Sequence, residues 1–579
     1  MPFSPPVRSW FEAAFPEPTL AQARAWPSIA AGEHTLLCAP TGSGKTLAAF
    51  LWAIDRIGSA PSREAGGTRV VYLSPLRALA VDIEKNLRSP IRGIELAAQR
   101  VGGSFVAPSV GLRTGDTSPE ERRKMAKRPP DILVTTPESL YLLLTSAARD
   151  GLASVETVIV DEIHALAPTK RGAHMALSLE RLHTWVTAHG YPTPQRIGLS
   201  ATQRPLETVA DFLGGRDVDG AVSKPRPVRI VDAGITKELD LEVRVPVEDM
   251  ASLGTIVEEP QAGAAAAGPQ RRSIWPSMHP ALLELVEQHR STLIFVNARR
   301  MAERLSSRLN ELHDEAIALK AEATDGTTGS LQPSRSDVVA AGAESIGTSN
   351  PDGVELVKAH HGSLSRERRL MIEDELKRGT LAGLVATSSL ELGIDMGAVD
   401  LVIQVASPGS VAAGLQRIGR AGHQVGVPSR GRIFPRHRAD LLETAVVAER
   451  MHSGEIEHTK IVRNPLDVLA QQLVATVALE DVSVEGLYAL ARGTANFAEL
   501  SEVQFRNTLD LVSGRYPAEE FGGLSPRVVW DRTDDVVRAR RGTQRIAVTS
   551  GGTIWRSIDS MEYSATSAPL KLPCSNNGT

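Results

Sequence analysis

Short apolar runs alternate with longer amphipathic stretches over the first part of the chain. The runs are rich in Val, Ile and Leu, and they occur at 35–39, 69–74, 131–135, 155–160 and 196–200. The stretches between them carry apolar residues at helical spacing. Buried parallel strands joined by helices show this alternation. The pattern therefore predicts an α/β fold, with a first doubly wound domain over residues 1–232.

The same alternation returns in a second series of runs, at 291–296, 354–359, 382–386 and 400–404. It predicts a second parallel-sheet domain over residues 233–438. Residues 321–351 interrupt this series with Gly, Ser, Thr, Ala and Asp, and we expect them to form a flexible insertion. Residues 439–528 show helical spacing without comparable runs, which predicts a helical accessory domain.

The length and composition limit the classes of protein to consider. A chain of 579 residues exceeds what one hydrophobic core supports, which predicts several domains. No apolar run has transmembrane length, the first residues lack the parts of a signal peptide, and the only cysteines are Cys38 and Cys574. We therefore expect a cytoplasmic protein with no membrane partner and no disulfide or zinc framework. The net charge of −4 argues against coating nucleic acid by bulk electrostatics, but it allows local basic grooves.

The segment from Ala39 to Thr46 reads Ala-Pro-Thr-Gly-Ser-Gly-Lys-Thr and lies between a strand-like run and a helical stretch. It matches the phosphate-binding pattern G-x-x-x-x-G-K-[ST] with Ala39 in the first glycine position. Small residues let backbone N–H groups face phosphate oxygens, Lys45 adds a positive charge, and the Thr46 hydroxyl can ligate Mg²⁺. The motif predicts a site for ATP and Mg²⁺ that is formed by Thr41, Gly42, Ser43, Gly44, Lys45 and Thr46.

An aromatic residue and an amide precede this loop at Phe15 and Gln22. Such a pair could stack on an adenine ring and hydrogen-bond its edge. The alternative is a packed helical segment that has no contact with the nucleotide. The residues alone leave both interpretations open.

Two adjacent carboxylates, Asp161 and Glu162, follow a β-branched run directly. An isolated pair of this kind is more often a solvated acidic turn. With a phosphate loop upstream, the pair is typical of a hydrolytic site in which Asp161 holds Mg²⁺ and Glu162 positions water. The run at 196–200 ends in Ser200 and Thr202, small hydroxyl residues that can link the nucleotide site to a neighbouring surface.

Polar residues also follow the other runs of the first domain, namely Arg77, Arg113, Thr135 and Thr136. Loops at the C-terminal ends of parallel strands line one crevice, so we expect these residues to share a rim. Taken singly, each is more often a helix cap or a solvated side chain.

The second domain contains no phosphate loop, but it carries Gln416-Arg-Ile-Gly-Arg-Ala-Gly-His423. Arg417 and Arg420 are three residues apart and share a helical face. Planar cations suit the charge on a transferring phosphoryl group, and the small residues beside them allow another domain to approach closely. The alternative is a pair of surface arginines, but the segment favours arginine fingers that complete the ATP site.

In their order and number, these motifs resemble the superfamily 2 helicases, and more closely the large helicase-related (Lhr) family, over about residues 10–550. The resemblance is carried by Ala39–Thr46, Asp161–His164, Lys170–Leu182, Leu199–Gln203, His360–Ser365, Leu384–Asp395 and Gln416–His423. It implies two tandem RecA-like domains, a winged-helix-like domain over residues 439–528 and the incomplete start of a β-rich domain over residues 529–579.

The resemblance also implies an activity, which is ATP-driven 3′-to-5′ movement along single-stranded DNA. The motor would displace paired DNA or RNA strands and act in DNA repair. The resemblance implies ATP contacts by Gly393 and Asp395, and coupling between the two ligand sites by His164, Ser200, Thr202 and Gln416. Contacts with the strand backbone are implied for Arg77, Arg113, Thr135, Thr136, Asn297 and Thr387.

The end of the chain departs from the family. Residues 544–554 resemble the start of the β-rich domain, whereas residues 555–579 do not, and family members continue for several hundred residues. We therefore expect a truncated chain with a disordered tail, in which Val528 to Val548 are poorly anchored.

Two other functions compete with a strand-separating helicase. A shortened chain could be a nucleic-acid-stimulated ATPase clamp that grips a strand without separating a duplex. An RNA remodeller of the DEAD-box kind is less favoured, because the fourth residue of the acidic motif is His164 rather than Asp.

Overall fold

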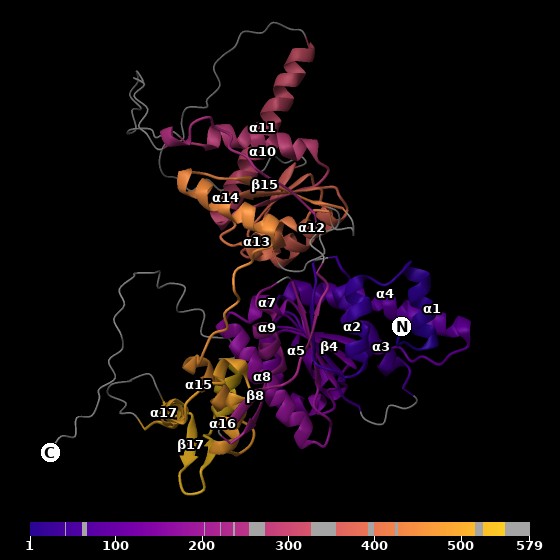
Figure 1. The fold of residues 1–579 in the computed structure, drawn as a ribbon, viewed down its shortest axis with the longest axis vertical. Helices are drawn as coiled ribbons and strands as arrows, with labels where there is room; N and C mark the ends of the chain where they lie inside the picture. The colour runs from indigo at the N-terminus through magenta and orange to yellow at the C-terminus, as the bar shows by residue number, and fades with distance from the viewer. Residues whose placement is uncertain are drawn as a thin grey trace, which may run out of the picture.

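The computed structural model describes most of the chain, namely residues 1–40, 42–60, 66–201, 203–220, 222–234, 238–253, 273–325, 355–391, 399–422, 427–515 and 525–549. In Figure 1, a second α/β domain (pink to orange) stands above the first (indigo to magenta), and a third, smaller domain (gold) lies beside the first. The predicted α/β class with two parallel-sheet domains is confirmed. The tail expected to be disordered, residues 555–579, lies outside the described residues.

The first domain is built on a seven-stranded sheet with the strand order β3-β4-β2-β5-β6-β1-β9. All of its neighbouring strands are parallel. The strands are β1 (Thr35–Cys38), β2 (Val70–Leu73), β3 (Val110–Arg113), β4 (Ile132–Thr135), β5 (Thr157–Val160), β6 (Gln195–Ser200) and β9 (Arg229–Asp232). Parallel pairing brings the C-terminal ends of these strands to one rim, as the sequence predicts.

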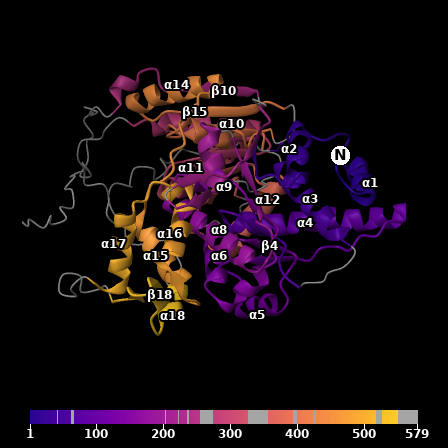
Figure 2. The same cartoon turned by 60° about the horizontal axis from the view of Figure 1, so that its bottom comes forward.

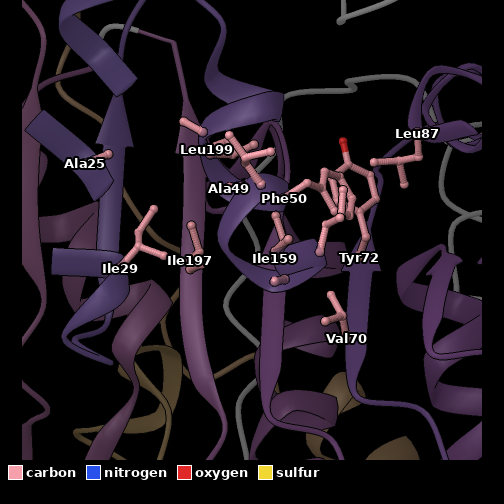
Figure 3. Packing of buried hydrophobic residues seen from close by; sticks show 14 of the residues in the cluster. Ala25, Ile29, Ala49, Phe50, Val70, Tyr72, Leu87, Ile159, Ile197 and Leu199 are labelled. Carbon is pink, nitrogen blue, oxygen red and sulfur yellow. The ribbon is translucent and has the colours of Figure 1, made fainter. Parts of the chain in front are cut away.

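Helices cover both faces of this sheet. One face carries α1 (Pro5–Ala14), α2 (Leu20–Ala30), α3 (Lys45–Gly58) and α4 (Arg77–Val101), and the other carries α6 (Pro137–Leu144), α7 (Ile163–Leu166), α8 (Lys170–Ala188) and α9 (Leu206–Gly214). Alternate residues of one strand serve the two cores, because Tyr72 packs on the first face and Leu73 on the second. Figure 3 shows the first core, with Phe50 of α3 against Tyr72 of β2. The short helix α5 (Pro119–Lys127) contributes no buried residue.

The second domain has a six-stranded parallel sheet with the order β10-β15-β14-β11-β13-β12. Its strands are β10 (Leu239–Val243), β11 (Thr292–Phe295), β12 (Val357–His360), β13 (Gly383–Ala386), β14 (Leu401–Val405) and β15 (Ser429–Phe434). Its helices are α10 (Trp275–Gln288), α11 (Arg299–Asp325), α12 (Arg366–Lys377), α13 (Val411–Ile418) and α14 (Arg438–Ser453). Residues 321–325 of the expected insertion at 321–351 continue α11, and residues 326–351 lie outside the described residues.

Helix α14 belongs with the second domain. Its Val447 and Met451 are buried in the same cluster as Val402 of β14 and Ile418 of α13. We therefore place the end of the second domain after α14 rather than at residue 438. The sequence pattern does not reveal this, because a helix that packs on a neighbouring sheet has the same periodicity as one that starts a new domain.

The third domain combines α15 (Leu466–Thr476), α16 (Val484–Arg492), α17 (Glu502–Ser513) and α18 (Thr543–Thr549) with a three-stranded antiparallel sheet of order β16-β18-β17. The strands are β16 (Val482–Ser483), β17 (Val528–Asp531) and β18 (Val536–Ala539). The expectation that Val528 to Val548 are poorly anchored is wrong for the described part. Val528 and Val537 are buried in the core of the third domain. The hairpin completes this domain instead of starting a separate one.

The third domain is fixed to the first. In Figures 1 and 2, α15 and α16 lie beside α8, and Ala173 and Leu177 of α8 are part of the core of the third domain. A small antiparallel hairpin of the first domain, β7 (Arg216–Asp219) and β8 (Val222–Pro225), adds a backbone bond from Arg216 N–H to Gly493 O of 2.7 Å. Among the described residues, no helix is both long and apolar enough to cross a bilayer.

Candidate nucleotide and nucleic-acid site

The phosphate loop joins the end of β1 to the start of α3. Gly42 and Gly44 have φ angles of 80° and 77°, in the left-handed region that glycine adopts without strain. A Cβ atom on Gly44 would lie 2.5 Å from Nε2 of Gln22. The backbone conformation therefore favours glycine at position 44, and any larger residue would also displace the end of the Gln22 side chain. Thr41 lies outside the described residues.

Lys45 begins α3 and bends its side chain back over the loop. Its Nζ donates hydrogen bonds to Ala39 O at 2.6 Å and Pro40 O at 2.7 Å. Burial lowers the pKa of Lys45, and the charge of Arg420 from the second domain lowers it further, whereas Asp161 and Glu162 raise it. The cation is thus held at the loop, next to both acidic residues, where it can bind phosphate oxygens.

Gln22 supports the loop from α2. Its Oε1 accepts a hydrogen bond from Thr19 N–H at 3.0 Å, and its Nε2 donates to Gly44 O at 3.4 Å. Thr19 also donates its hydroxyl to Ser43 O at 2.8 Å. Gln22 is therefore packed against the phosphate loop. Phe15 follows α1, with 39% of its surface exposed.

The acidic pair stands at the end of β5 on the same rim. Oδ1 of Asp161 accepts a hydrogen bond from Glu162 N–H at 2.8 Å, and its Oδ2 accepts one from the hydroxyl of Tyr72. Burial, and then the charge of Glu162, raise the pKa of Asp161 to about 6. Glu162 has a φ of 46°, an uncommon conformation for a residue other than glycine. The strained residue turns the chain away from the strand at the point where two carboxylates meet.

This donor set fits Mg²⁺. The ion prefers oxygen ligands, and the buried carboxylates of Asp161 and Glu162 repel each other until a cation balances their charge. Thr46 lies in the first turn of α3, next to Lys45, and is the hydroxyl residue at the start of this helix. Thr46 and Asp161 are thus the residues that could hold the metal.

His164 connects the two parallel-sheet domains. Its Nδ1 accepts a hydrogen bond from Ala201 N–H at 3.2 Å and lies 3.4 Å from Oγ of Ser200. Burial lowers the pKa of His164 to about 4, so the ring is neutral at pH 7 and carries its proton on Nε2. Nε2 of Gln416 lies 2.9 Å from this Nε2. Since two N–H groups cannot bond each other, the amide is assigned with its oxygen toward the ring, where it accepts the proton. Three predicted coupling residues therefore meet here, while Thr202 lies outside the described residues.

The two arginines of α13 and its C-terminal turn have different surroundings. Arg417 donates to Glu391, to Oε1 of Gln404 at 2.8 Å and to Oδ1 of Asn297 at 3.4 Å, all within the second domain. Arg420 donates to the backbone oxygen of Glu391, and its charge reaches Lys45. In this arrangement Arg417 is engaged inside its own domain, whereas Arg420 also acts on the phosphate loop through its charge.

The predicted strand-contact residues lie on the two rims, but they differ in exposure. Arg77 is exposed and pairs with Asp116 at 2.7 Å. Thr135 is buried and donates its hydroxyl to Arg113 O at 2.6 Å, and Thr136 is buried as the N-cap of α6. The hydroxyls of both threonines thus have partners within the protein, so these two residues do not offer them to a strand in this arrangement.

The remaining predicted residues are distributed as follows. Burial and the charge of Arg122 lower the pKa of Arg113. Asn297 is exposed after β11 and donates to Ser407 O at 3.1 Å, and Thr387 is half-buried after β13. Gly393 and Asp395 lie outside the described residues.

Three residues of the site escape the sequence reasoning: Tyr72, Glu391 and Gln404. Tyr72 reads as an ordinary strand residue, and Glu391 as one of many surface acids. Gln404 gives a signal, since it is a buried amide at the end of an apolar strand. Buried polar side chains need partners, so this position could have been linked to a nearby cation.

Comparison with known proteins finds three family models along the chain. They are the DEAD/DEAH box helicase model at residues 19–212, the helicase conserved C-terminal domain at 352–424 and the winged helix domain of the large helicase-related protein at 449–562. The last model includes β17 and β18, in agreement with their place in the third domain.

Similar proteins cover nearly the whole chain. The Lhr helicase/probable uracil glycosylase of Mycolicibacterium smegmatis is 52% identical over 95% of this chain and 34% of its own length. An ATP-dependent helicase Lhr-Core of Saccharolobus solfataricus is 36% identical over 95% of this chain and 56% of its own length. The solved structure of Mycobacterium smegmatis helicase Lhr bound to ssDNA and AMP-PNP has 50% identity and a TM-score of 0.79, over 95% of this chain and 62% of that one. The chain thus spans between about a third and somewhat over half the length of these curated relatives.

Proposed function

Because the chain belongs to the Lhr family of superfamily 2 DEAD/DEAH-box helicases, we propose that it is an ATP-dependent motor on single-stranded DNA. It moves 3′ to 5′ and displaces paired DNA or RNA strands. One observation carries the proposal. The phosphate loop and the acidic pair share one rim, and Gln416 of the arginine segment in the second domain contacts His164 of the acidic motif at 2.9 Å.

The nucleotide is bound and hydrolysed between the two domains. Phosphate oxygens bind to backbone N–H groups around Gly42 and Gly44 and to the amine of Lys45. The family resemblance assigns further contacts with ATP to Thr41, Gly393 and Asp395. Asp161 and Thr46 hold Mg²⁺, which balances negative charge on the phosphates when it is bound. Glu162 orients the attacking water and accepts its proton.

The second domain contributes charge and coupling. Arg420 stabilises the charge that develops on the transferred phosphoryl group, while Arg417 holds the segment in place through Glu391. The bond between His164 and Gln416 joins the acidic motif to α13, so closure of the cleft and hydrolysis depend on each other. Ser200 and Thr202 extend this link toward the nucleic-acid rim.

Single-stranded DNA lies across the rims of both parallel sheets. The solved Lhr relative is described as bound to ssDNA, which supports this partner. Arg77 and Arg113 of the first domain and Asn297 and Thr387 of the second contact the sugar-phosphate backbone, so binding is tolerant of sequence. Thr135 and Thr136 contribute through their backbone groups or through a local rearrangement. Membership of the Lhr family supports two further proposals, a cytoplasmic location and a role in DNA repair.

A strand-displacement assay tests the proposal. The substrates are matched DNA–DNA and RNA–DNA duplexes, each with a single-stranded DNA tail at either the 3′ or the 5′ end. We expect ATP-dependent displacement from 3′-tailed substrates of both kinds and little from 5′-tailed ones. Equal strand displacement from 3′-tailed and 5′-tailed substrates would contradict the proposed 3′-to-5′ movement. ATP turnover without displacement from any substrate indicates the clamp instead of a helicase.

A further inference from the structure

A buried tyrosine contacts the acidic pair from a neighbouring strand. The Tyr72 side chain is fully buried, and its hydroxyl donates a hydrogen bond to Oδ2 of Asp161. The opposite oxygen, Oδ1, accepts from Glu162 N–H at 2.8 Å. Each oxygen of the carboxylate thus has one donor, and the two donors come from different strand segments.

The tyrosine ring is itself fixed by the helix of the phosphate loop. It stacks on Phe50, with ring centroids 5.0 Å apart and ring planes inclined by 27° (Figure 3). Phe50 lies on α3, whose first residues are Lys45 and Thr46. The backbone at Tyr72 is held as well, because β2 pairs in parallel with β5, the strand that leads to Asp161.

The geometry leaves Asp161 able to bind a metal. A carboxylate has about four lone-pair directions, and the two donors use one on each oxygen. The donors among the described residues leave the other directions to a cation, and they restrict rotation of the carboxylate about its Cβ–Cγ bond. Partners of this kind set the orientation of metal ligands in many proteins.

We propose that Tyr72 is a positioning residue that orients the Asp161 carboxylate for Mg²⁺ and ties it to the phosphate-loop helix through Phe50. The inference rests on the proposed function, since it concerns the metal used in ATP hydrolysis. It assigns Tyr72 a role beyond packing in the core. The competing possibility is that the hydroxyl occupies an oxygen that the metal needs, in which case removing it would strengthen metal binding.

The test compares two tyrosines in the full chain. Tyr72→Phe removes the hydroxyl and keeps the ring on Phe50. Tyr141→Phe is the matched control, because Tyr141 is also fully buried and donates its hydroxyl to Ala547 O at 3.2 Å, in the contact between the first and third domains. Binding of Mn²⁺, as a probe for Mg²⁺, is measured by electron paramagnetic resonance in the presence of a non-hydrolysable ATP analogue.

We expect Tyr72→Phe to bind Mn²⁺ about 10- to 100-fold more weakly, and Tyr141→Phe to match the wild type. The Mg²⁺ concentration that gives half-maximal ATP turnover should rise by a similar factor, while the affinity for the metal-free analogue stays unchanged. Equal or tighter Mn²⁺ binding by Tyr72→Phe overturns the inference. A loss of metal-free nucleotide affinity would show a general structural role and would overturn it as well.

A second variant tests the link to the loop helix. Phe50→Leu keeps the hydroxyl but removes the stacked ring, and we expect a smaller loss of Mn²⁺ affinity in the same direction. Unchanged affinity would contradict the part of the inference that involves α3. A different result would refute the proposed function itself, namely a wild-type chain that binds no nucleotide or turns over no ATP.

Discussion

Arg181 offers a sharp test of how the third domain is attached to the first. Its guanidinium is buried in α8 and donates to Oε1 of Gln472 at 3.0 Å, and to the oxygens of Leu144 and Ala475 at 3.2 Å each. Gln472 and Ala475 belong to α15 of the third domain. Burial lowers the pKa of Arg181 to about 10, so the side chain remains charged at pH 7.

The cost of removing this side chain follows from its acceptors. The guanidinium also donates to Oγ1 of Thr145 at 3.2 Å, so in Arg181→Leu four buried oxygens lose their donor, at about 1 kcal/mol or more for each. Two of these oxygens, in Gln472 and Ala475, belong to the third domain, so the contact between the two domains should lose about 2 kcal/mol, which corresponds to roughly a thirtyfold change in a local opening equilibrium.

Amide hydrogen exchange measures that opening directly. We expect the amides of α15 to exchange roughly thirtyfold faster in Arg181→Leu, while those of the second domain are unchanged. The control is Asp467→Asn, which breaks an ion pair with Lys170 at 2.8 Å in the same interface, with both side chains partly exposed. Such pairs contribute about 0–1 kcal/mol. If Arg181→Leu exchanges like the wild type, or if both variants lose the same amount, the assignment of Arg181 as the main anchor is wrong.

Three further predictions concern the nucleotide site and the buried histidines. Lys45→Ala should abolish ATP turnover without lowering the thermal unfolding temperature, and normal turnover would contradict the phosphate-loop assignment. Arg420→Ala should slow hydrolysis at saturating ATP by about 10³-fold, with a much smaller change in nucleotide affinity, and a pure loss of affinity would make Arg420 a ground-state contact. Burial lowers the pKa of His174 to about 4, below its value of about 6.5 in an unfolded chain, so the unfolded state binds the extra proton. The contribution of His174 to the free energy of unfolding should therefore fall by up to about 3 kcal/mol between pH 6.5 and 4 and stay level above pH 7, and His174→Gln should reduce the slope of unfolding free energy against pH by that amount in unfolding curves recorded at each pH.

The sequence predicts which rim carries the residues of the candidate nucleotide site, because its signals are local. The glycines, Lys45 and the acidic pair each follow a strand directly, and parallel pairing alone brings such positions to one rim. The solvent exposure of a side chain, in contrast, depends on residues that are distant in the sequence. Thr135 and Thr136 follow the same rule, yet their hydroxyls are taken up by Arg113 O and by the cap of α6.

A sequence pattern also does not predict which residues a side chain will hydrogen-bond. Arg417 and Arg420 are equivalent in a helical repeat, but only the folded second domain places Glu391, Gln404 and Asn297 around the first of them. For a related reason, the sequence does not reveal that the β17–β18 hairpin packs in the third domain. Its partner β16 has only two residues, too few to give a periodic signal, and it is separated from the hairpin by two helices.

The rate of ATP hydrolysis by the purified chain, with and without single-stranded DNA, tests the central claim most directly. The account predicts slow turnover by the protein alone and a marked increase when single-stranded DNA is added, because a strand across both rims favours the closed cleft that brings Arg420 to the nucleotide. The same low rate with and without DNA would contradict the proposal that this chain is a DNA-dependent motor.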